Sequence, residues 1–373
     1  MSEAVLGLDA RLARDAIISD CSAGLTTREL FTRVSARLRP FVPFDAAGWL
    51  ATDPATLLYT DAVTEGVDSA AHVRLFENEL LESDFMKFAH ILESGRSVAT
   101  LWSATDGQPS LSPRYKKIYQ PLGLEAELRA VFATGGSCWG IACLTRAEGA
   151  PGFTQAEIDY VGSLTESIAR GLRVALLLNE VDESPVDDAP GMIVLGPDGR
   201  PESITEAAER WLSLLPSEYA DERAVLPSAI QAVALRARAN VDGSAGTVPQ
   251  VRLRLASGRW LTVHAAELRG TDPPRTAILV EPARRAELAE LYAEIYALTE
   301  RERQVAALLV RGLAIDEIAQ GLWLSHHTVR DHIKAIYGKL GVSSRPELTA
   351  KLVAEDFPRP ADRGHADTRQ ADV

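Results

Sequence analysis

Residues 324–340 read LSHHTVRDHIKAIYGKL, and this stretch decides the fold of the C-terminal part of the chain. Ser325 belongs to the residue types that cap the free amides at a helix start. At 100° per residue, the apolar side chains that follow fall on one stripe: Val329, Ile333, Ile336 and Leu340. Arg330 and Lys334 fall on the opposite half. The pattern predicts a helix with a buried stripe and an exposed basic face.

Other helix starts lie close to this helix. Thr299–Glu302 and Ser344–Glu347 both have the spacing of a capping box, in which a hydroxyl and a carboxylate satisfy amides at the helix start. Between them, Gly312 ends one helix, and a second helix carries the apolar residues Ile315, Ile318, Ala319 and Leu322. Short helices joined by tight turns are typical of a helix-turn-helix. A helix with projecting cations can enter the roughly 12 Å wide major groove and donate to guanine edges.

This region resembles the DNA-binding domain of the LuxR family of bacterial transcription regulators. The resemblance rests on residues that occur in the family's order and spacing: Leu298–Glu302, Gly312–Leu313, Glu317–Ala319, Leu324–Ser325, Thr328–Val329, His332, Lys339–Val342, Arg345 and Glu347–Leu348. It implies that the helix after Ser325 is the recognition helix and that the last helix, from Pro346, serves dimerisation. The residues expected to bind DNA are Ser325, His326, His327, Thr328, Arg330, Asp331, Lys334 and Lys339.

Two positions depart from the family pattern. Ala314 stands where the family usually has a capping hydroxyl, a change that costs on the order of 1 kcal/mol. Asp331 places an acid beside the basic face. Its carboxylate could accept from a cytosine amino group or repel a phosphate, and the sequence leaves both readings open.

Residues 20–180 mix helical and strand periods, which predicts an α+β domain. Strands are expected near residues 47–51, 57–60, 128–133 and 139–144, and helices near 71–81 and 85–93. The capping box Thr154–Glu157 starts a heptad-like pattern that predicts one unbroken helix to about Leu178, pairing at its far end with a second copy.

This region resembles GAF-type sensor domains at four places: Asp45–Trp49, Ser83–Phe85, Gly123–Arg129 and Trp139–Gly140. Such domains bind small ligands or only transmit and dimerise. Four aromatic side chains are candidates for lining a ligand pocket, with an ordinary core as the alternative: Trp49, Trp102, Phe132 and Trp139.

Residues 191–282 read as strand, helix and then antiparallel strands, and they resemble a PAS domain at Gly199 and Ala207–Leu212. The predicted fold class is therefore multidomain α+β: a GAF-like domain, a PAS-like domain and an all-α four-helix helix-turn-helix of LuxR type. The expected boundaries are 1–180 (GAF-like), 181–190 (acidic linker), 191–282 (PAS-like), 283–298 (connecting helix), 299–357 (helix-turn-helix) and 358–373 (disordered tail).

The formal net charge of the 373 residues is −13, which by itself argues against a protein that coats nucleic acid. The acidity is unevenly distributed, because residues 297–352 hold eight Lys and Arg against six Asp and Glu. No apolar run is long enough for a membrane span and no signal peptide is recognisable, so we expect a cytoplasmic protein without a membrane partner.

Motifs for catalysis are absent from the sequence: there is no glycine-rich phosphate loop, paired-histidine zinc motif or nucleophile elbow. The spacing of His326, His327 and His332 does not converge on a metal. The sequence thus predicts a dimeric, non-enzymatic transcription regulator that binds double-stranded operator DNA. No cofactor is expected, and the sequence leaves open whether the GAF-like or PAS-like domain binds an unidentified small molecule. RNA polymerase is a candidate further partner. The alternative is a protein-interaction scaffold with a degenerate helix-turn-helix.

Overall fold

The computed structural model describes residues 7–176, 188–215, 226–241, 248–255, 257–270 and 272–353. The chain forms two compact units, residues 1–283 and residues 284–373. The expected acidic linker lies mostly, and the expected tail wholly, outside the described residues. Among the described residues, no helix is long and apolar enough to cross a membrane.

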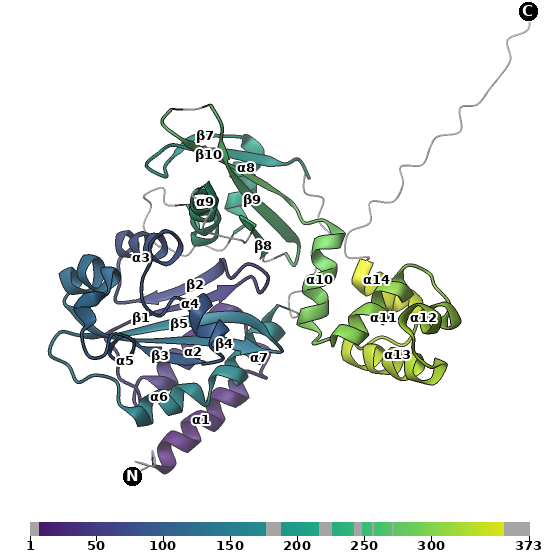
Figure 1. Ribbon diagram of the computed structural model, residues 1–373, viewed down its shortest axis with the longest axis horizontal. Helices are drawn as coiled ribbons and strands as arrows, with labels where there is room; N and C mark the ends of the chain where they lie inside the picture. Colours follow the sequence, from purple (N-terminus) through teal and green to yellow (C-terminus); the bar gives the residue numbers. More distant parts are fainter. Residues whose placement is uncertain are drawn as a thin grey trace, which may run out of the picture. The chain divides into compact units, whose positions relative to one another are not determined.

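The first unit begins with a five-stranded antiparallel sheet in the order β2-β1-β5-β4-β3 (Figure 1). Its strands are β1 (Ala46–Thr52), β2 (Tyr59–Glu65), β3 (Val98–Thr100), β4 (Leu124–Thr134) and β5 (Ser137–Ala147). Its helices are α1 (Leu8–Asp20), α2 (Thr27–Leu38), α3 (Ser69–Leu81), α4 (Phe88–Glu93), α5 (Leu101–Ala104), α6 (Gln155–Gly162) and α7 (Thr165–Ala175). Helices α2 and α7 cover one face of the sheet, while α3 and α4 lie on the other (Figure 1).

The predicted long helix after Thr154 is wrong, because α6 ends at Gly162 and α7 starts at Thr165. Hydroxyls bond to backbone carbonyls at the break: Ser163 Oγ donates to Tyr160 O at 2.8 Å, and Thr165 Oγ1 donates to Gly162 O at 2.9 Å. Such bonds offer the backbone an alternative to the regular helix.

The apolar side chains of α7 are buried within the chain itself, since Ile168 and Leu172 are each 2% exposed. A Cβ atom at Gly140 of β5 would come within 2.6 Å of Leu172 Cδ1, so the glycine permits this close packing. The heptad pattern is therefore explained by the core, and it gives no support for pairing with a second copy.

A second five-stranded antiparallel sheet completes this unit, in the order β7-β6-β10-β9-β8. It consists of β6 (Gly191–Leu195), β7 (Pro201–Ile204), β8 (Gln250–Arg254), β9 (Trp260–Leu268) and β10 (Arg275–Pro282), with the helices α8 (Glu206–Ser213) and α9 (Ser228–Val241). The expected hairpin between β6 and β7 forms. The sequence interpretation did not include α9, whose apolar side chains are buried nearly all round. A helix without a polar face lacks the contrast on which periodicity depends.

The two sheets of the first unit are joined by a buried ion pair. Arg252 of β8 donates to both carboxylate oxygens of Asp53, from Nε at 2.9 Å and from Nη2 at 2.6 Å. Asp53 directly follows β1 and is 3% exposed. A buried two-point bond of this kind fixes geometry as well as charge.

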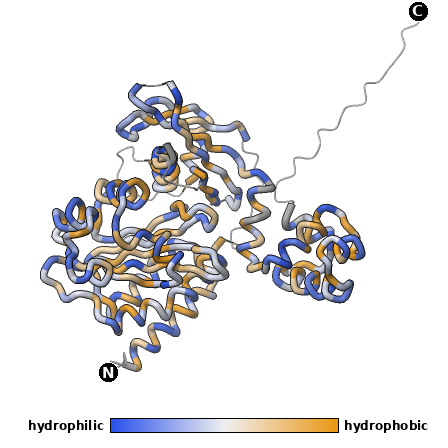
Figure 2. The backbone as a smooth tube through the Cα atoms, viewed as in Figure 1, coloured by the Kyte–Doolittle hydropathy of each residue, from blue (hydrophilic) through white to orange (hydrophobic). Residues whose placement is uncertain are grey.

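The second unit is helical, with α10 (Arg285–Ile295), α11 (Glu300–Val310), α12 (Ile315–Leu322), α13 (His326–Leu340) and α14 (Arg345–Val353). Its core includes Val305, Ile318, Val329, Ile336 and Leu348, all completely buried. Hydrophilic and hydrophobic residues are interspersed along the chain of this unit (Figure 2). The multidomain α+β class and the four C-terminal helices are confirmed, whereas the domain boundaries stay predictions.

Candidate nucleic-acid interface and sensor pocket

Helix α13 starts where the sequence predicts, with Ser325 as its N-cap. Ser325 Oγ accepts a hydrogen bond from the backbone N–H of Thr328 at 3.1 Å, and the two hydroxyl oxygens lie 2.8 Å apart. Ser325 is exposed. The amides at the start of a helix attract anions, so this exposed end is a suitable place for a phosphate.

The two sides of α13 are as different as the sequence predicts. Val329 and Ile336 are completely buried, and Leu340 is 1% exposed. Arg330 and Lys334 are exposed, and neither makes a hydrogen bond or an ion pair with another described residue. These two cations are therefore available to a partner outside the chain.

Two histidines at the start of α13 lie beside carboxylates. His326 Nε2 is 3.4 Å from Asp316 Oδ1 of α12, and His327 Nε2 is 3.6 Å from Asp331 Oδ2 one turn along α13. Both attractions require a protonated imidazole. When His327 is protonated, it attracts the Asp331 carboxylate within the same helix. The charge of Asp331 is then partly balanced by His327 before any DNA is bound.

Lys339 does not belong to the exposed basic face. At 100° per residue, nine positions separate it from Arg330 by half a turn. Its ammonium lies 2.5 Å from Glu302 Oε2 and donates to the carbonyl of Ala297 at 3.0 Å. The attraction of Lys339 and the hydrogen bonds at the helix start lower the pKa of Glu302 although partial burial opposes them. Lys339 therefore joins α13 to the start of α11, and its expected contact with DNA stays a prediction.

Further cations of this unit hold helix ends. Arg345 Nε donates to Leu309 O at 2.9 Å, at the end of α11. Lys351 Nζ donates to Leu340 O at 2.7 Å, at the end of α13. Cations near a helix C-terminus stabilise the helix through its dipole and its free carbonyls. The local excess of positive charge is thus partly structural, whereas the side chains of Arg330, Lys334 and Arg311 are exposed and bond to no other described residue.

The missing cap of α12 is visible in the structure. Ala314 occupies the N-cap position and contributes no side-chain hydrogen bond. Glu317 Oε2 accepts the backbone N–H of Ala314 at 2.6 Å. One half of a capping box is therefore present, and the half that a hydroxyl would supply is absent.

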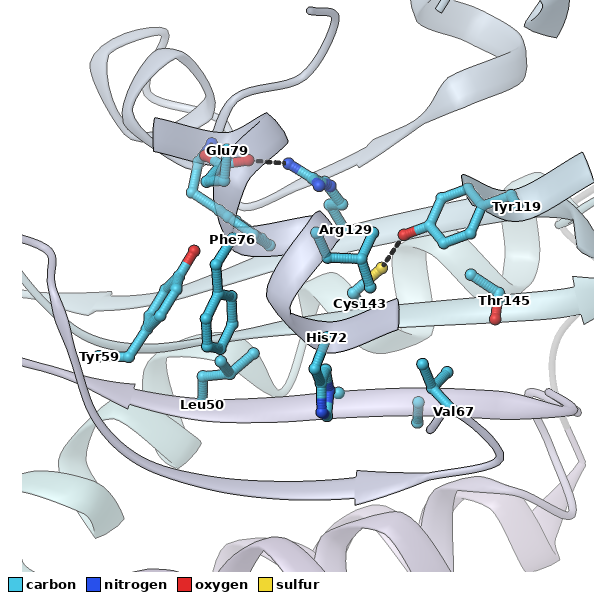
Figure 3. Close-up of a pocket in the computed structure, with 14 residues that line it drawn as sticks. Leu50, Tyr59, Val67, His72, Phe76, Glu79, Tyr119, Arg129, Cys143 and Thr145 are labelled. Carbon is cyan, nitrogen blue, oxygen red and sulfur yellow. Dashed lines mark hydrogen bonds and ion pairs between the residues drawn. The ribbon is translucent and has the colours of Figure 1, made fainter. Parts of the chain in front are cut away.

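A small pocket lies between α3 and the sheet in the first unit (Figure 3). Its volume is about 40 Å³, enough for roughly three water molecules. It is lined by Ala47, Gly48, Leu50, Tyr59, Val67, His72, Leu75, Phe76, Glu79, Phe88, Tyr119, Arg129, Cys143 and Thr145. An apolar cavity with a few polar groups is the usual form of a small-molecule site.

A buried network of charges lies beside this pocket and reaches its wall through Glu79, Tyr119 and Arg129. Glu127 accepts from Arg114 Nη2 at 2.7 Å, from Arg129 Nε at 2.8 Å and from the hydroxyl of Tyr119 at 2.9 Å. Arg129 Nη1 also donates to Glu79 Oε2 at 2.6 Å (Figure 3). Burial alone would raise the pKa of Glu127, but the two guanidinium groups lower it to about 2. The network is ionised and internally satisfied.

His72 faces the same pocket from α3 (Figure 3). Its ring is stacked on Phe76 with 5.9 Å between centroids, and it is 4% exposed. Burial lowers the pKa of His72 to about 4, against the weaker opposing effect of Asp68. The imidazole is therefore neutral near pH 7.

The four aromatic residues predicted to line a pocket do not line this one. Trp49 stacks on Phe132 with ring centroids 6.2 Å apart, and both are 1% exposed. Trp49 lies between the pocket residues Gly48 and Leu50, so its side chain points to the opposite face of the sheet. Trp139 is 2% exposed, and Trp102 is 65% exposed. Three of the four are thus core residues, which was the alternative interpretation.

The charged network beside the pocket was not recognised in the sequence. Glu127 and Arg129 are two apart on β4 and therefore share a face. Charged residues at alternate positions of a mostly apolar strand, Glu125, Glu127 and Arg129, were the available signal. Arg114 and Glu79 come from other elements, so no local spacing connects them to this pair.

Comparisons with known proteins agree with the helix-turn-helix geometry. Residues 296–352 match the bacterial regulatory proteins of the luxR family. A putative HTH-type transcriptional regulator of Aeromonas salmonicida is 53% identical over 51 residues, which are 14% of this chain and 26% of that protein. The chain spans only about a quarter of the length of that relative and of UhpA from Escherichia coli (26% and 28%).

The match to a shorter relative is more complete. The spore germination protein GerE of Bacillus subtilis is 45% identical over 56 residues, which are 15% of this chain and 76% of GerE. Among solved structures, the GAF domain of an Acinetobacter phosphoenolpyruvate-protein phosphotransferase aligns with 48% of this chain and 100% of its own, at 9% identity and a TM-score of 0.33. Through its C-terminal helices, the chain belongs to the luxR family of bacterial regulatory proteins.

Proposed function

We propose that this chain is a sequence-specific transcription regulator that reads double-stranded operator DNA with α13. The observation that carries the proposal is the pair Arg330 and Lys334, exposed on one side of a well-capped helix and without a partner among the described residues. Arginine and lysine in this position can donate to the N7 and O6 atoms of guanine. The exposed start of α13 supplies amides and the Ser325 hydroxyl for a phosphate.

Genome-wide footprinting with the purified chain tests this function. A sequence-specific regulator protects discrete sites that share a motif. Absence of discrete protected sites contradicts the proposal and favours the alternative, an interaction scaffold with a degenerate helix-turn-helix. Salt dependence supplies a second readout, because the logarithm of the binding constant falls with the number of phosphates neutralised.

We further propose that the regulator binds as a homodimer, with two copies of α13 in half-sites about one turn of DNA apart. The support is the family resemblance, in which the last helix serves dimerisation. Sedimentation of the full chain at micromolar concentration, with and without operator, measures the stoichiometry directly. A single copy on the operator at saturation contradicts the dimer.

For the first unit we propose a sensor role without catalytic activity, in a regulator that works in the cytoplasm and acts on RNA polymerase. The pocket against α3 supports a small ligand, because it combines apolar walls with the polar groups of His72, Tyr119 and Thr145. Its present volume requires a ligand to displace side chains such as Phe76. Native mass spectrometry of the full chain after mild purification detects a retained ligand, and transcription in vitro with purified RNA polymerase tests the downstream effect.

A further inference from the structure

Trp323 is the most exposed of the large apolar side chains among the described residues, with 94% of its surface accessible. It stands in the turn between α12 and α13. Of the other five tryptophans, four are at most 5% exposed. An indole that remains in water forgoes one of the largest gains that burial offers.

The backbone at Trp323 is also unfavourable for a bulky residue. Its φ is +56° and its ψ is +43°, in the left-handed region. The N–H of Leu324 bonds to Ala319 O at 2.9 Å, and Leu324 packs against the core. This is the arrangement that usually ends a helix with glycine, because a residue with a Cβ atom is disfavoured in the left-handed region. Helix termination alone does not explain a tryptophan at this position.

Trp323 lies next to the proposed DNA-reading surface. It precedes the N-cap Ser325 by two residues, so the two Cα atoms are at most about 7.6 Å apart. His326, the first residue of α13, is exposed as well. The indole therefore extends the surface at the end of α13 where a phosphate would approach.

The surroundings favour DNA over a protein partner. In the described part of residues 284–353, every other large hydrophobic residue is at least partly buried. The exposed neighbours of Trp323 along the chain are Gln320, Gly321 and Ser325. A protein interface needs a contiguous apolar centre, which a lone ring within polar residues does not provide. A sugar-phosphate backbone matches it better, because the deoxyribose has an apolar face and the phosphate accepts from the indole N–H.

We propose that Trp323 contacts the operator backbone beside the recognition helix, with its ring against a deoxyribose and its Nε1–H donating to a phosphate oxygen. The inference rests on the proposed DNA-binding function. Backbone contacts position a protein but carry no base information. Trp323 therefore adds affinity at all sequences, whereas Arg330 distinguishes between them.

The test compares the full-length wild type with Trp323→Gly, Trp323→Phe and Arg330→Ala on the operator from footprinting and on a scrambled duplex. Trp323→Gly should weaken binding about tenfold on both duplexes, equivalent to about 1.4 kcal/mol, while the melting temperature stays equal or rises. Trp323→Phe should lose less affinity, since it keeps the ring and lacks the N–H. Leu111→Ala removes another exposed apolar side chain, 52% accessible, and should not change binding.

Acrylamide quenching gives an independent readout. The difference between wild type and Trp323→Phe isolates the signal of Trp323, which should become protected when operator is added. Wild-type affinity in Trp323→Gly, or an indole that stays accessible in the complex, overturns the inference. Unchanged DNA binding with loss of transcription activation overturns it in favour of a protein partner. If the wild type binds the operator and the scrambled duplex equally, the proposed function fails rather than the inference about Trp323. The Arg330→Ala variant distinguishes the two failures, because it loses the preference for the operator only if α13 reads DNA.

Discussion

Arginine has opposite roles in the two units of this chain. Arg129 is 3% exposed and its guanidinium bonds to Glu127, Glu79 and the carbonyl of Met86. Arg330 is exposed and bonds to no described residue. Buried charges must be paired within the fold, whereas a recognition surface has to leave its donors unpaired. The comparison shows that available hydrogen-bond donors, rather than charge counts, mark the candidate interface.

The largest expected effect comes from breaking the buried network. Arg114→Met removes a side chain with no exposed surface and leaves the Glu127 carboxylate short of a partner. We expect the free energy of unfolding of the first unit to fall by about 3–5 kcal/mol. Urea unfolding followed by circular dichroism measures the change. The control is Lys117→Met, which breaks the exposed pair with Glu82 and should cost less than about 1 kcal/mol. Equal losses in both variants contradict the assignment.

The next largest effect is a loss of folding stability at acidic pH that comes from His72. Its folded pKa of about 4 lies below the ordinary 6.5, so the unfolded chain binds the extra proton first as the pH falls. Stability is therefore fully present above pH 6.5 and is lost between 6.5 and 4, by up to about 3 kcal/mol. Urea titrations at pH 7.5 and pH 5 should show the loss in the wild type and a smaller loss in His72→Phe. The same pH dependence in both proteins assigns it to other groups.

A smaller effect is expected from restoring the missing N-cap hydroxyl of α12 in the second unit. Ala314→Thr supplies the missing hydroxyl to α12 and should stabilise that helix by about 0.5–1 kcal/mol. Hydrogen exchange in the full chain should slow at the amide of Glu317, the third helical residue, where a capping oxygen accepts. Unchanged exchange there would show that the Glu317 half of the capping box already suffices, and faster exchange would contradict the expected stabilisation.

The C-terminal helices were predictable from sequence because their information is local. Ser325 and Val329 lie within one helix, so spacing alone determines the cap and the buried face. The ion pair of Lys339 could not be predicted from spacing because its partner, Glu302, is 37 residues away. The buried charge network was missed for the same reason, since Arg114 and Glu127 come together only in the tertiary structure. The break at Ser163 was hidden because the apolar pattern continues across it.

The most direct test of the central claim is a titration of the full chain with its footprinted operator and with the operator changed at single guanines. Arg330→Ala should lose about 1–3 kcal/mol of operator binding and its discrimination at one base pair, with an unchanged melting temperature. Arg301→Ala, which removes an exposed arginine from α11, is the matched control and should keep that discrimination. Equal affinity and base preference in Arg330→Ala, Lys334→Ala and the wild type would contradict the claim that α13 reads DNA.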